Sequence, residues 1–299
     1  TESLSCQSAL KREQKCLPCA GIFVSAAMLE RHFMEEIKMK YILGGVVMSA
    51  LAGLAQAEIK VEQVDYEIDG KPFEGRLVYD ASVQAPRPGV LMVPNWMGVT
   101  DAAVEKASKV AGTNYVVFVA DMYGRDIRPA NAEEAGAAAS TVRDDRALMR
   151  TRVNAGLDLL ASQTQAPVAS DQLVAIGFCF GGGSVLELAR SGTELKGVVS
   201  FHGNLDTPNP ADATNIKAPI LVLHGADDPF VPDQQVADFQ AEMRDAGVDW
   251  QLISYGGAVH SFSDPYANMA GKAEYHPVVA KRSFAAMHQF FGEVLGAAE

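Results

Sequence analysis

Residues 174–183 read VAIGFCFGGG, and this stretch decides the fold. An apolar run ends in a turn whose central residue is Cys179, with Gly177 and Gly181 two positions to either side. Glycines at this spacing let a strand turn sharply into a helix, so that the central side chain stands exposed. The pattern therefore predicts a nucleophile elbow with a thiol at its tip. The alternative is that Cys179 is a small core residue, because free cysteine is among the most buried residue types.

On both sides of this stretch, short apolar runs alternate with helical patterns. Asp69-Gly70 separates the alternating segments 59–68 and 73–79, which is a strong hairpin signal. Further strands are expected at 89–93, 115–120, 173–176, 197–200, 219–223 and 250–255, and helices at 101–112, 131–163, 181–191, 233–246 and 277–295. Buried strands alternating with helices indicate a parallel sheet covered on both faces. We therefore expect one α/β domain over residues 58–299, with a mostly parallel central sheet and an N-terminal antiparallel hairpin.

Composition excludes some classes of partner. The chain of 299 residues is 48% hydrophobic, as expected for a globular protein with a core. Its net charge of -12 argues against nucleic acid or an anionic membrane surface as the main partner. Histidine pairs at metal-ligand spacing are lacking, so the sequence indicates neither a metal site nor a cofactor. It says nothing about the oligomeric state.

The segment 39–57 has the features of a secretory signal peptide. Met39-Lys40 is followed by an apolar stretch at 41–54 and then by Ala55-Gln56-Ala57. The stretch is short for a bilayer span, which needs about 20 residues. We expect cleavage after Ala57, a secreted or periplasmic protein without a membrane anchor, and residues 1–38 to be a mis-called or non-native extension. The alternative is a genuine extension followed by an internal signal anchor.

Signal cleavage would leave the chain with a single cysteine. Cys6, Cys16 and Cys19 all precede the expected cleavage site, so only Cys179 would remain. A lone cysteine in an exported protein forms an intermolecular bridge or is a free thiol with a function. The C-x-x-C spacing of Cys16 and Cys19 has no second pair nearby and is interpreted as incidental.

Three reactive side chains follow predicted strands. Cys179, then Asp227-Asp228, then His260 come in the order nucleophile, acid, histidine, which is the order of the triad on α/β-hydrolase sheets. Because ligands bind at the carboxyl ends of parallel strands, these loops should meet. An imidazole can take the thiol proton, and a carboxylate fixes the tautomer of the imidazole. The helix N-terminus should lower the pKa of the thiol further.

Each partner of the thiol has an alternative. His202 and His224 also end apolar strands, and His260 is preferred for its place in the chain order. Either aspartate could instead cap a helix or hold a turn. An oxyanion hole is expected from the backbone N–H of Phe180 and from one in the Asn95-Trp96 loop. The side chains expected to shape the pocket are Trp96, Met97, Tyr123 and Phe230.

These residues resemble the dienelactone hydrolase (carboxymethylenebutenolidase) family of α/β-hydrolases. The resemblance spans residues 58–299 and rests on the segments 94–99, 121–125, 177–182, 225–232 and 260–262. It implies hydrolysis of a small ester or lactone through a thioacyl intermediate on a triad of Cys179, His260 and Asp228. Asp228 is chosen because it lies three residues after Gly225 in a G-x-x-D-x-x-V-P pattern.

Two positions depart from the family pattern. Asn95 stands where the family has a glutamate that helps activate the thiol, and an amide cannot accept a proton. Activation is then expected from His260 alone, and Asn95 is expected to orient the thiol or the oxyanion-hole loop. The family also binds a substrate carboxylate with two arginines: Arg125 matches the first, but Asp264 stands at the second. An anion there should repel a carboxylate, so dienelactone itself is disfavoured as the substrate.

The alternative function is a catalytically silent, secreted binding or scaffold protein on the same fold. The two departures motivate it, and retention of the three triad residues argues against it. A thiol redox protein is disfavoured because the processed chain lacks a resolving cysteine.

Overall fold

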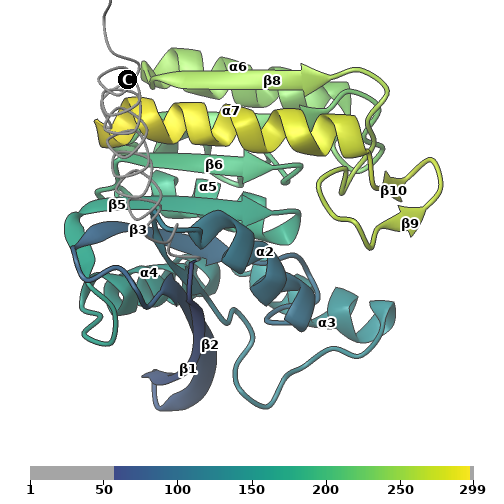
Figure 1. The fold of residues 1–299 in the computed structure, drawn as a ribbon. Coiled ribbons are helices and arrows are strands. Elements are labelled where there is room, and N and C mark those ends of the chain that lie inside the picture. The colour runs from purple at the N-terminus through teal and green to yellow at the C-terminus, as the bar shows by residue number, and fades with distance from the viewer. Residues whose placement is uncertain (1–56, 297–299) are drawn as a thin grey trace, which may run out of the picture. The chain divides into compact units, whose positions relative to one another are not determined.

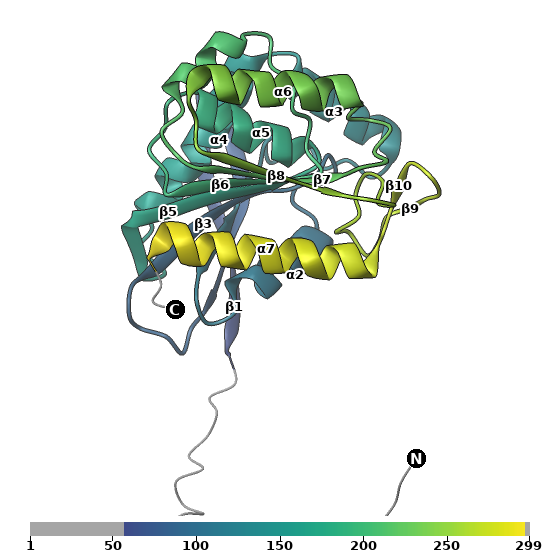
Figure 2. The same ribbon diagram turned by 90° about the horizontal axis from the view of Figure 1, so that it is seen from above.

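The computed structural model describes residues 57–296. The predicted extension (1–38) lies outside the described residues, as does the predicted signal peptide except for its last residue, Ala57. The described chain forms an eight-stranded sheet between two layers of helices (Figures 1 and 2). None of its helices is both long and apolar enough to cross a membrane.

The sheet begins with the predicted hairpin. Strands β1 (Ile59–Ile68) and β2 (Lys71–Asp80) pair antiparallel around Asp69 and Gly70. Both turn residues have positive φ, 50° and 72°, as a two-residue type I′ loop requires. The Asp-Gly signal is therefore confirmed.

The remaining strands of this sheet run parallel to one another. They are β3 (Arg87–Val93), β4 (Val116–Val119), β5 (Val168–Phe178), β6 (Gly197–Phe201), β7 (Ile220–Gly225) and β8 (Trp250–Tyr255). The order is β1-β2-β4-β3-β5-β6-β7-β8, with β2 antiparallel to β4. This confirms the predicted α/β-hydrolase fold with a mostly parallel sheet. The strand carrying the elbow lies centrally, with β3 and β6 as neighbours.

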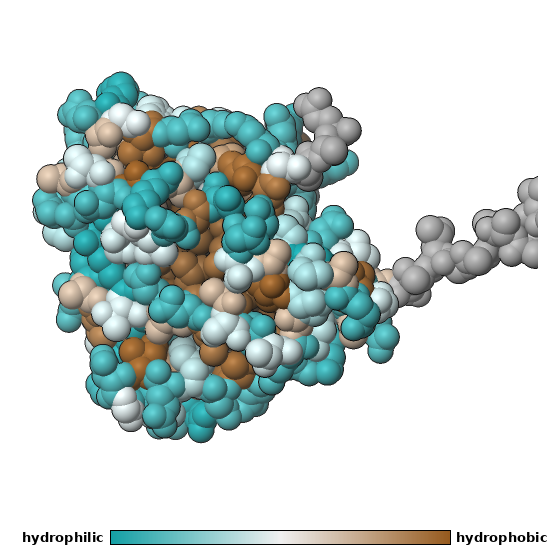
Figure 3. Space-filling model, turned by 90° about the vertical axis from the view of Figure 1, so that its left-hand side faces the viewer, coloured by the Kyte–Doolittle hydropathy of each residue, from teal (hydrophilic) through white to brown (hydrophobic). Residues whose placement is uncertain are grey.

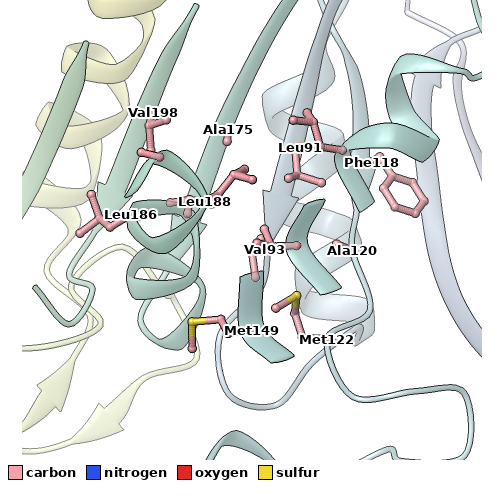
Figure 4. Packing of buried hydrophobic residues seen from close by; sticks show 14 of the residues in the cluster. Leu91, Val93, Phe118, Ala120, Met122, Met149, Ala175, Leu186, Leu188 and Val198 are labelled. Atoms are coloured by element: carbon pink, nitrogen blue, oxygen red, sulfur yellow. The ribbon is translucent and has the colours of Figure 1, made fainter. Parts of the chain in front are cut away.

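Helices cover both faces of the sheet. One face is covered by α2 (Asp101–Ala111) and α7 (Pro277–Leu295), the other by α3 (Ala132–Arg143), α4 (Arg146–Ala161), α5 (Phe180–Arg190) and α6 (Asp233–Ala246) (Figure 2). Successive strand side chains alternate between the two layers because the side-chain period of a strand is two. Figure 4 shows Leu91, Val93, Ala175 and Val198 of one face against Leu186 and Leu188 of α5.

The single helix predicted over 131–163 is wrong. The chain breaks into α3 and α4 at Asp144 and Asp145. The Asp145 side chain accepts the backbone N–H of Leu148 at 2.9 Å and so starts α4 as its N-cap. Three short elements were not predicted: a 3-10 helix at Pro210–Asn215, and the strands β9 (Asn268–Met269) and β10 (Ala273–Glu274).

The parallel strands have their carboxyl ends on one side of the molecule and their amino ends on the other (Figure 1). The carboxyl ends of β5, β6 and β8 point toward the β9–β10 hairpin (Figure 1). The opposite face, toward the amino ends, shows apolar areas interspersed with polar side chains (Figure 3). The residues predicted to be reactive follow the carboxyl ends, so the site is built there.

Candidate active site

The elbow places Cys179 between β5 and α5. Its φ of 56° is a conformation that a residue with a side chain rarely adopts, which is the strain expected at a nucleophile elbow. A Cβ at Gly177 would lie 2.0 Å from the carbonyl oxygen of Gly181, and a Cβ at Gly181 would lie 2.1 Å from that of Val93. Only glycine fits either position, so the sequence forces the turn that presents the thiol.

His260 and Asp228 form a buried pair beside the thiol. Nδ1 of His260 lies 2.7 Å from Oδ2 of Asp228. The other carboxylate oxygen accepts the backbone N–H of Phe230 at 2.8 Å, which fixes the carboxylate in its loop after β7. The imidazole also hydrogen-bonds the Cys179 thiol. The three groups thus form one continuous hydrogen-bonded series.

The thiol and the imidazole change each other's protonation. Burial lowers the pKa of His260, but the negative charge of the Cys179 thiolate and the hydrogen bond to Asp228 raise it to about 10. Burial likewise raises the pKa of Cys179, and this is outweighed by the charge and hydrogen bond of His260, so that the pKa lies below its ordinary value. The geometry therefore favours a thiolate–imidazolium pair.

Two backbone donors converge on the same sulfur. The N–H groups of Phe180 and Trp96 both hydrogen-bond Cys179 and lower the pKa of its thiol. The Trp96 loop is held from two sides: the Asn95 side chain accepts the N–H of Met97 at 3.0 Å, and the hydroxyl of Tyr123 donates to the carbonyl oxygen of Trp96 at 2.9 Å. Donors arranged in this way can also bind an oxyanion formed next to the sulfur.

A cavity of about 410 Å³ opens onto Cys179 and His260. Its mouth has two exposed apolar side chains, Phe230 at 48% exposure and Met269 at 49%. Arg143, from the end of α3, brings a guanidinium to the lining. The remaining lining residues are mostly small or apolar: Trp96, Gly136, Ala139, Ser140, Phe180, Asn204, Ser261 and Ala273.

The β9–β10 hairpin is tied directly to His260. The backbone N–H of His260 donates to the carbonyl oxygen of Lys272 at 3.1 Å, and that of Glu274 donates to the carbonyl oxygen of His260 at 3.0 Å. The hairpin therefore fixes the backbone of the histidine while its Met269 lines the cavity.

Several positions expected at the substrate pocket lie elsewhere, and the cavity lining includes neither Met97 nor Tyr123. Arg125 does not line the cavity; its guanidinium is 2.8 Å from Asp65 of β1. Asp264 faces away from the cavity, toward Asn95 at 3.2 Å and Lys106 at 3.9 Å. Asp264 is therefore not placed to repel a substrate carboxylate, because its own carboxylate contacts Asn95 and Lys106.

The alternative histidines and aspartate are also placed. His202 is buried behind His260, with ring centroids 5.2 Å apart, and its Nε2 lies 2.8 Å from the Ser263 hydroxyl. His224 is buried as well, and Asp227 is exposed. Of the described histidines, His260 alone lines the cavity. In the same part of the chain, no group of acidic, histidine and cysteine side chains could hold a metal ion.

Sequence reasoning missed Arg143 and Met269. Arg143 lies in the last turn of α3, where a basic residue is common for its favourable interaction with the helix dipole. Met269 lies on a strand of two residues, too short to show an alternating pattern. Neither had a signal that distinguishes it from an ordinary surface residue.

Known proteins share both the sequence pattern and this fold. The model of the dienelactone hydrolase family matches residues 73–295. A protein from a Bradyrhizobium species, named "Probable 2-oxo-3-(5-oxofuran-2-ylidene)propanoate lactonase", is 28% identical over 77% of this chain and 93% of its own length.

Solved structures of dienelactone hydrolase-like proteins are also similar to this chain. The structure of a dienelactone hydrolase-like promiscuous phosphotriesterase from metagenomic libraries is 38% identical, covers 79% of this chain and 99% of its own, and superposes with a TM-score of 0.75. The dienelactone hydrolase of Anabaena variabilis, at 20% identity and a TM-score of 0.56 over 77% of this chain and 98% of its own, shares the fold.

Proposed function

Because the chain belongs to the dienelactone hydrolase family of ester and lactone hydrolases, we propose that it cleaves small carboxylic esters or lactones with Cys179 as nucleophile. The observation that supports this most strongly is the hydrogen-bonded series Cys179, His260 and Asp228 at a cavity of about 410 Å³. Two backbone N–H groups at the sulfur complete the requirements for acyl transfer.

Acylation follows from this geometry. The thiolate of Cys179 attacks the carbonyl carbon, a C–S bond forms, and the N–H groups of Trp96 and Phe180 hold the oxyanion. The tetrahedral species then collapses with cleavage of the C–O bond. The His260 imidazolium gives its proton to the departing alkoxide, and Asp228 keeps the ring oriented.

Deacylation reverses these roles. The neutral His260 takes a proton from water, and the resulting hydroxide attacks the thioester carbonyl. The C–S bond breaks and the carboxylic acid leaves. Cys179 returns as thiolate and His260 as imidazolium, so no external acid or base is consumed. Asn95 takes no part as a base, because an amide cannot accept the proton.

Arg143 refines the proposed substrate. The cavity is mostly apolar and its lining carries one guanidinium, while Asp264 lies outside it. We propose that the substrate combines a small apolar body with a carboxylate that Arg143 binds. The name of the Bradyrhizobium relative likewise describes a lactone ring joined to a propanoate, which is a carboxylate.

The nucleophile is tested by replacing Cys179 with Ala. We expect this variant to fold and to lose turnover of 4-nitrophenyl acetate, whereas Cys179→Ser should keep a small fraction, because a hydroxyl depends more on the base. Hydrolysis by the Ala variant at the wild-type rate would refute the proposal. Rapid labelling of the wild-type thiol at neutral pH would argue against the silent scaffold.

Arg143→Gln tests the substrate class. We expect KM to rise about tenfold or more for an ester bearing a carboxylate, with little change for a neutral ester of the same size. Arg125→Gln is the matched control, because its guanidinium lies with Asp65. Equal changes for both substrates would exclude carboxylate binding by Arg143.

A second activity is proposed on the 38% identity to the promiscuous phosphotriesterase. The same thiolate and donors could act on the phosphorus of a triester. Release of 4-nitrophenol from a 4-nitrophenyl dialkyl phosphate, lost in Cys179→Ala, would establish it, and its absence would limit the site to acyl groups.

We also propose export, on the signal-like segment 39–57. The protein recovered from the periplasm or medium should begin at Glu58. A start upstream of residue 39 would exclude cleavage there.

A further inference from the structure

A largely buried lysine lies near the elbow, outside the lining of the active-site cavity. Lys106 projects from α2 and its side chain is only 13% exposed. Its ammonium lies 4.3 Å from the ring centroid of Phe178, the residue that precedes the nucleophile, and 3.9 Å from Oδ2 of Asp264. A buried ammonium is costly unless charge or aromatic faces compensate it, so both contacts are needed to keep the cation there.

The carboxylate that pairs with Lys106 also holds the loop of the oxyanion donors. Oδ2 of Asp264 accepts the side-chain N–H of Asn95 at 3.2 Å. The amide oxygen of Asn95 accepts the backbone N–H of Met97 at 3.0 Å. Trp96, whose N–H hydrogen-bonds the sulfur, lies between Asn95 and Met97 in the chain. The two positions that depart from the family pattern are therefore in contact with each other.

The charge of Lys106 reaches the nucleophile. Burial lowers the pKa of Lys106, while the negative charges of Asp264 and of the Cys179 thiolate raise it, leaving it below the ordinary value. By reciprocity, the cation favours the thiolate over the thiol, as a contribution smaller than those of His260 and of the N–H groups of Phe180 and Trp96. The family's glutamate would activate the thiol by accepting its proton. A lysine cation instead stabilises the thiolate by its positive charge and accepts no proton.

We propose that Lys106, held beneath the elbow by Asp264 and the Phe178 ring, is a positioning residue that stabilises the Cys179 thiolate. Its charge compensates for the amide at position 95, where the family has a glutamate. The inference rests on the proposed role of Cys179 as nucleophile. The ionisable groups that surround the thiol or its histidine from other elements are Asp228, His260, His202, His224, Tyr123 and Arg143. Asp264 and Lys109 act on Lys106 itself.

The test measures the thiol directly. Rates of Cys179 alkylation by iodoacetamide are followed against pH in the wild type and in Lys106→Met, Lys106→Gln and Lys106→Arg. The two neutral variants remove the charge with different shapes, so that one is available if the other does not fold. The Arg variant keeps the charge, and a neighbouring cavity of about 240 Å³ lined by Lys106 leaves room for its longer side chain. Lys109→Met, which removes an exposed lysine of the same helix, is the control.

We expect the labelling midpoint of the neutral variants to move alkaline by roughly one pH unit, making labelling about tenfold slower at pH values below both midpoints. Lys106→Arg and Lys109→Met should keep the wild-type midpoint. A purely structural role would affect thermal unfolding in all three Lys106 variants without this dependence on charge.

An unchanged midpoint in either folded neutral variant would overturn the proposal, as would an equal shift in Lys106→Arg. The readout needs no substrate. A failure of ester hydrolysis in the wild type would therefore refute the proposed function and leave the role of Lys106 to be decided by the labelling alone.

Discussion

Replacing Asp228 with Asn tests how the carboxylate supports the imidazole. The wild-type carboxylate is buried, with Oδ2 at 2.7 Å from Nδ1 of His260 and Oδ1 accepting the N–H of Phe230 at 2.8 Å. The amide keeps the shape but removes the charge. It can also present an N–H to Nδ1, which favours the tautomer unable to accept the thiol proton.

The expected size follows from the pKa of His260. Burial lowers this pKa, while the thiolate charge and Asp228 raise it to about 10. An opposite charge in hydrogen-bond contact shifts a pKa by about 1–3 units. The pKa of His260 should therefore fall by about two units in the variant, which corresponds to nearly 3 kcal/mol less stabilisation of the imidazolium. A less stable imidazolium also raises the pKa of the thiol. With the tautomer change, kcat/KM at neutral pH should fall between about a hundredfold and ten-thousandfold.

The direction of the pH dependence can be worked out. The active pair exists above the pKa of the Cys179 thiol, and it is lost as pH rises through the pKa of His260, about 10 in the wild type. In Asp228→Asn the alkaline limb moves to lower pH and the acid limb to higher pH, so the profile narrows from both sides.

The assay is kcat/KM for 4-nitrophenyl acetate across both limbs, corrected for spontaneous hydrolysis. Asp227→Asn is the matched control, because it makes the same change at an exposed neighbour and should leave both limbs in place. An alkaline limb that stays where it was in Asp228→Asn, or a kcat/KM within tenfold of the wild type, would refute the reasoning.

Three further substitutions probe the parts that surround the site. Gly181→Ala places a Cβ 2.1 Å from a backbone carbonyl oxygen, so urea unfolding should show a loss of more than about 3 kcal/mol; a loss below 1 kcal/mol would show that the turn can relax. Tyr123→Phe removes the hydrogen bond to the Trp96 carbonyl oxygen, so kcat/KM should fall about fivefold with nearly unchanged stability, whereas full activity would show that the loop holds itself. Glu242→Gln breaks a buried pair in which both oxygens lie 2.8 Å from Arg190 nitrogens, so the free energy of unfolding should fall by about 3 kcal/mol at constant kcat; a drop in kcat would mean that the pair supports the site.

The fold was predictable because its inner strands, such as β4, β6 and β7, are buried on both faces. Runs such as 89–93 and 219–223 read as continuous apolar segments, and the hairpin was marked by Asp69-Gly70. The break between α3 and α4 was missed because Asp144 and Asp145 are compatible with a helix surface as well as with a cap. The β9–β10 hairpin pairs through two residues on each strand, so no periodicity can show it.

The order of the residues in the chain and the glycines of the turn predicted which residues meet at the site, but not how the loop side chains are oriented. Glycines around Cys179 define an elbow, and a parallel sheet brings the ends of its strands to one edge, which is enough to place Asp228 and His260 near the thiol. Which way a loop side chain points is set by tertiary packing. The sequence pointed to Arg125 as the anion ligand and gave no signal for Arg143, and only the structure shows that Arg143 lines the cavity.

The direction of Asp264 changes what the departures from the family pattern mean. Considered singly, Asn95 is a lost base, which argues against activation of the thiol, and Asp264 is a lost cation, which argues against a carboxylate substrate. In the structure they share a hydrogen bond, and Asp264 pairs with Lys106 instead of facing the cavity. If Lys106 stabilises the thiolate as proposed, the loss of the glutamate does not leave the thiol without activation. The proposed role of Lys106 then replaces activation by a proton acceptor with activation by a nearby cation, and the proposed role of Arg143 assigns the substrate carboxylate to that guanidinium.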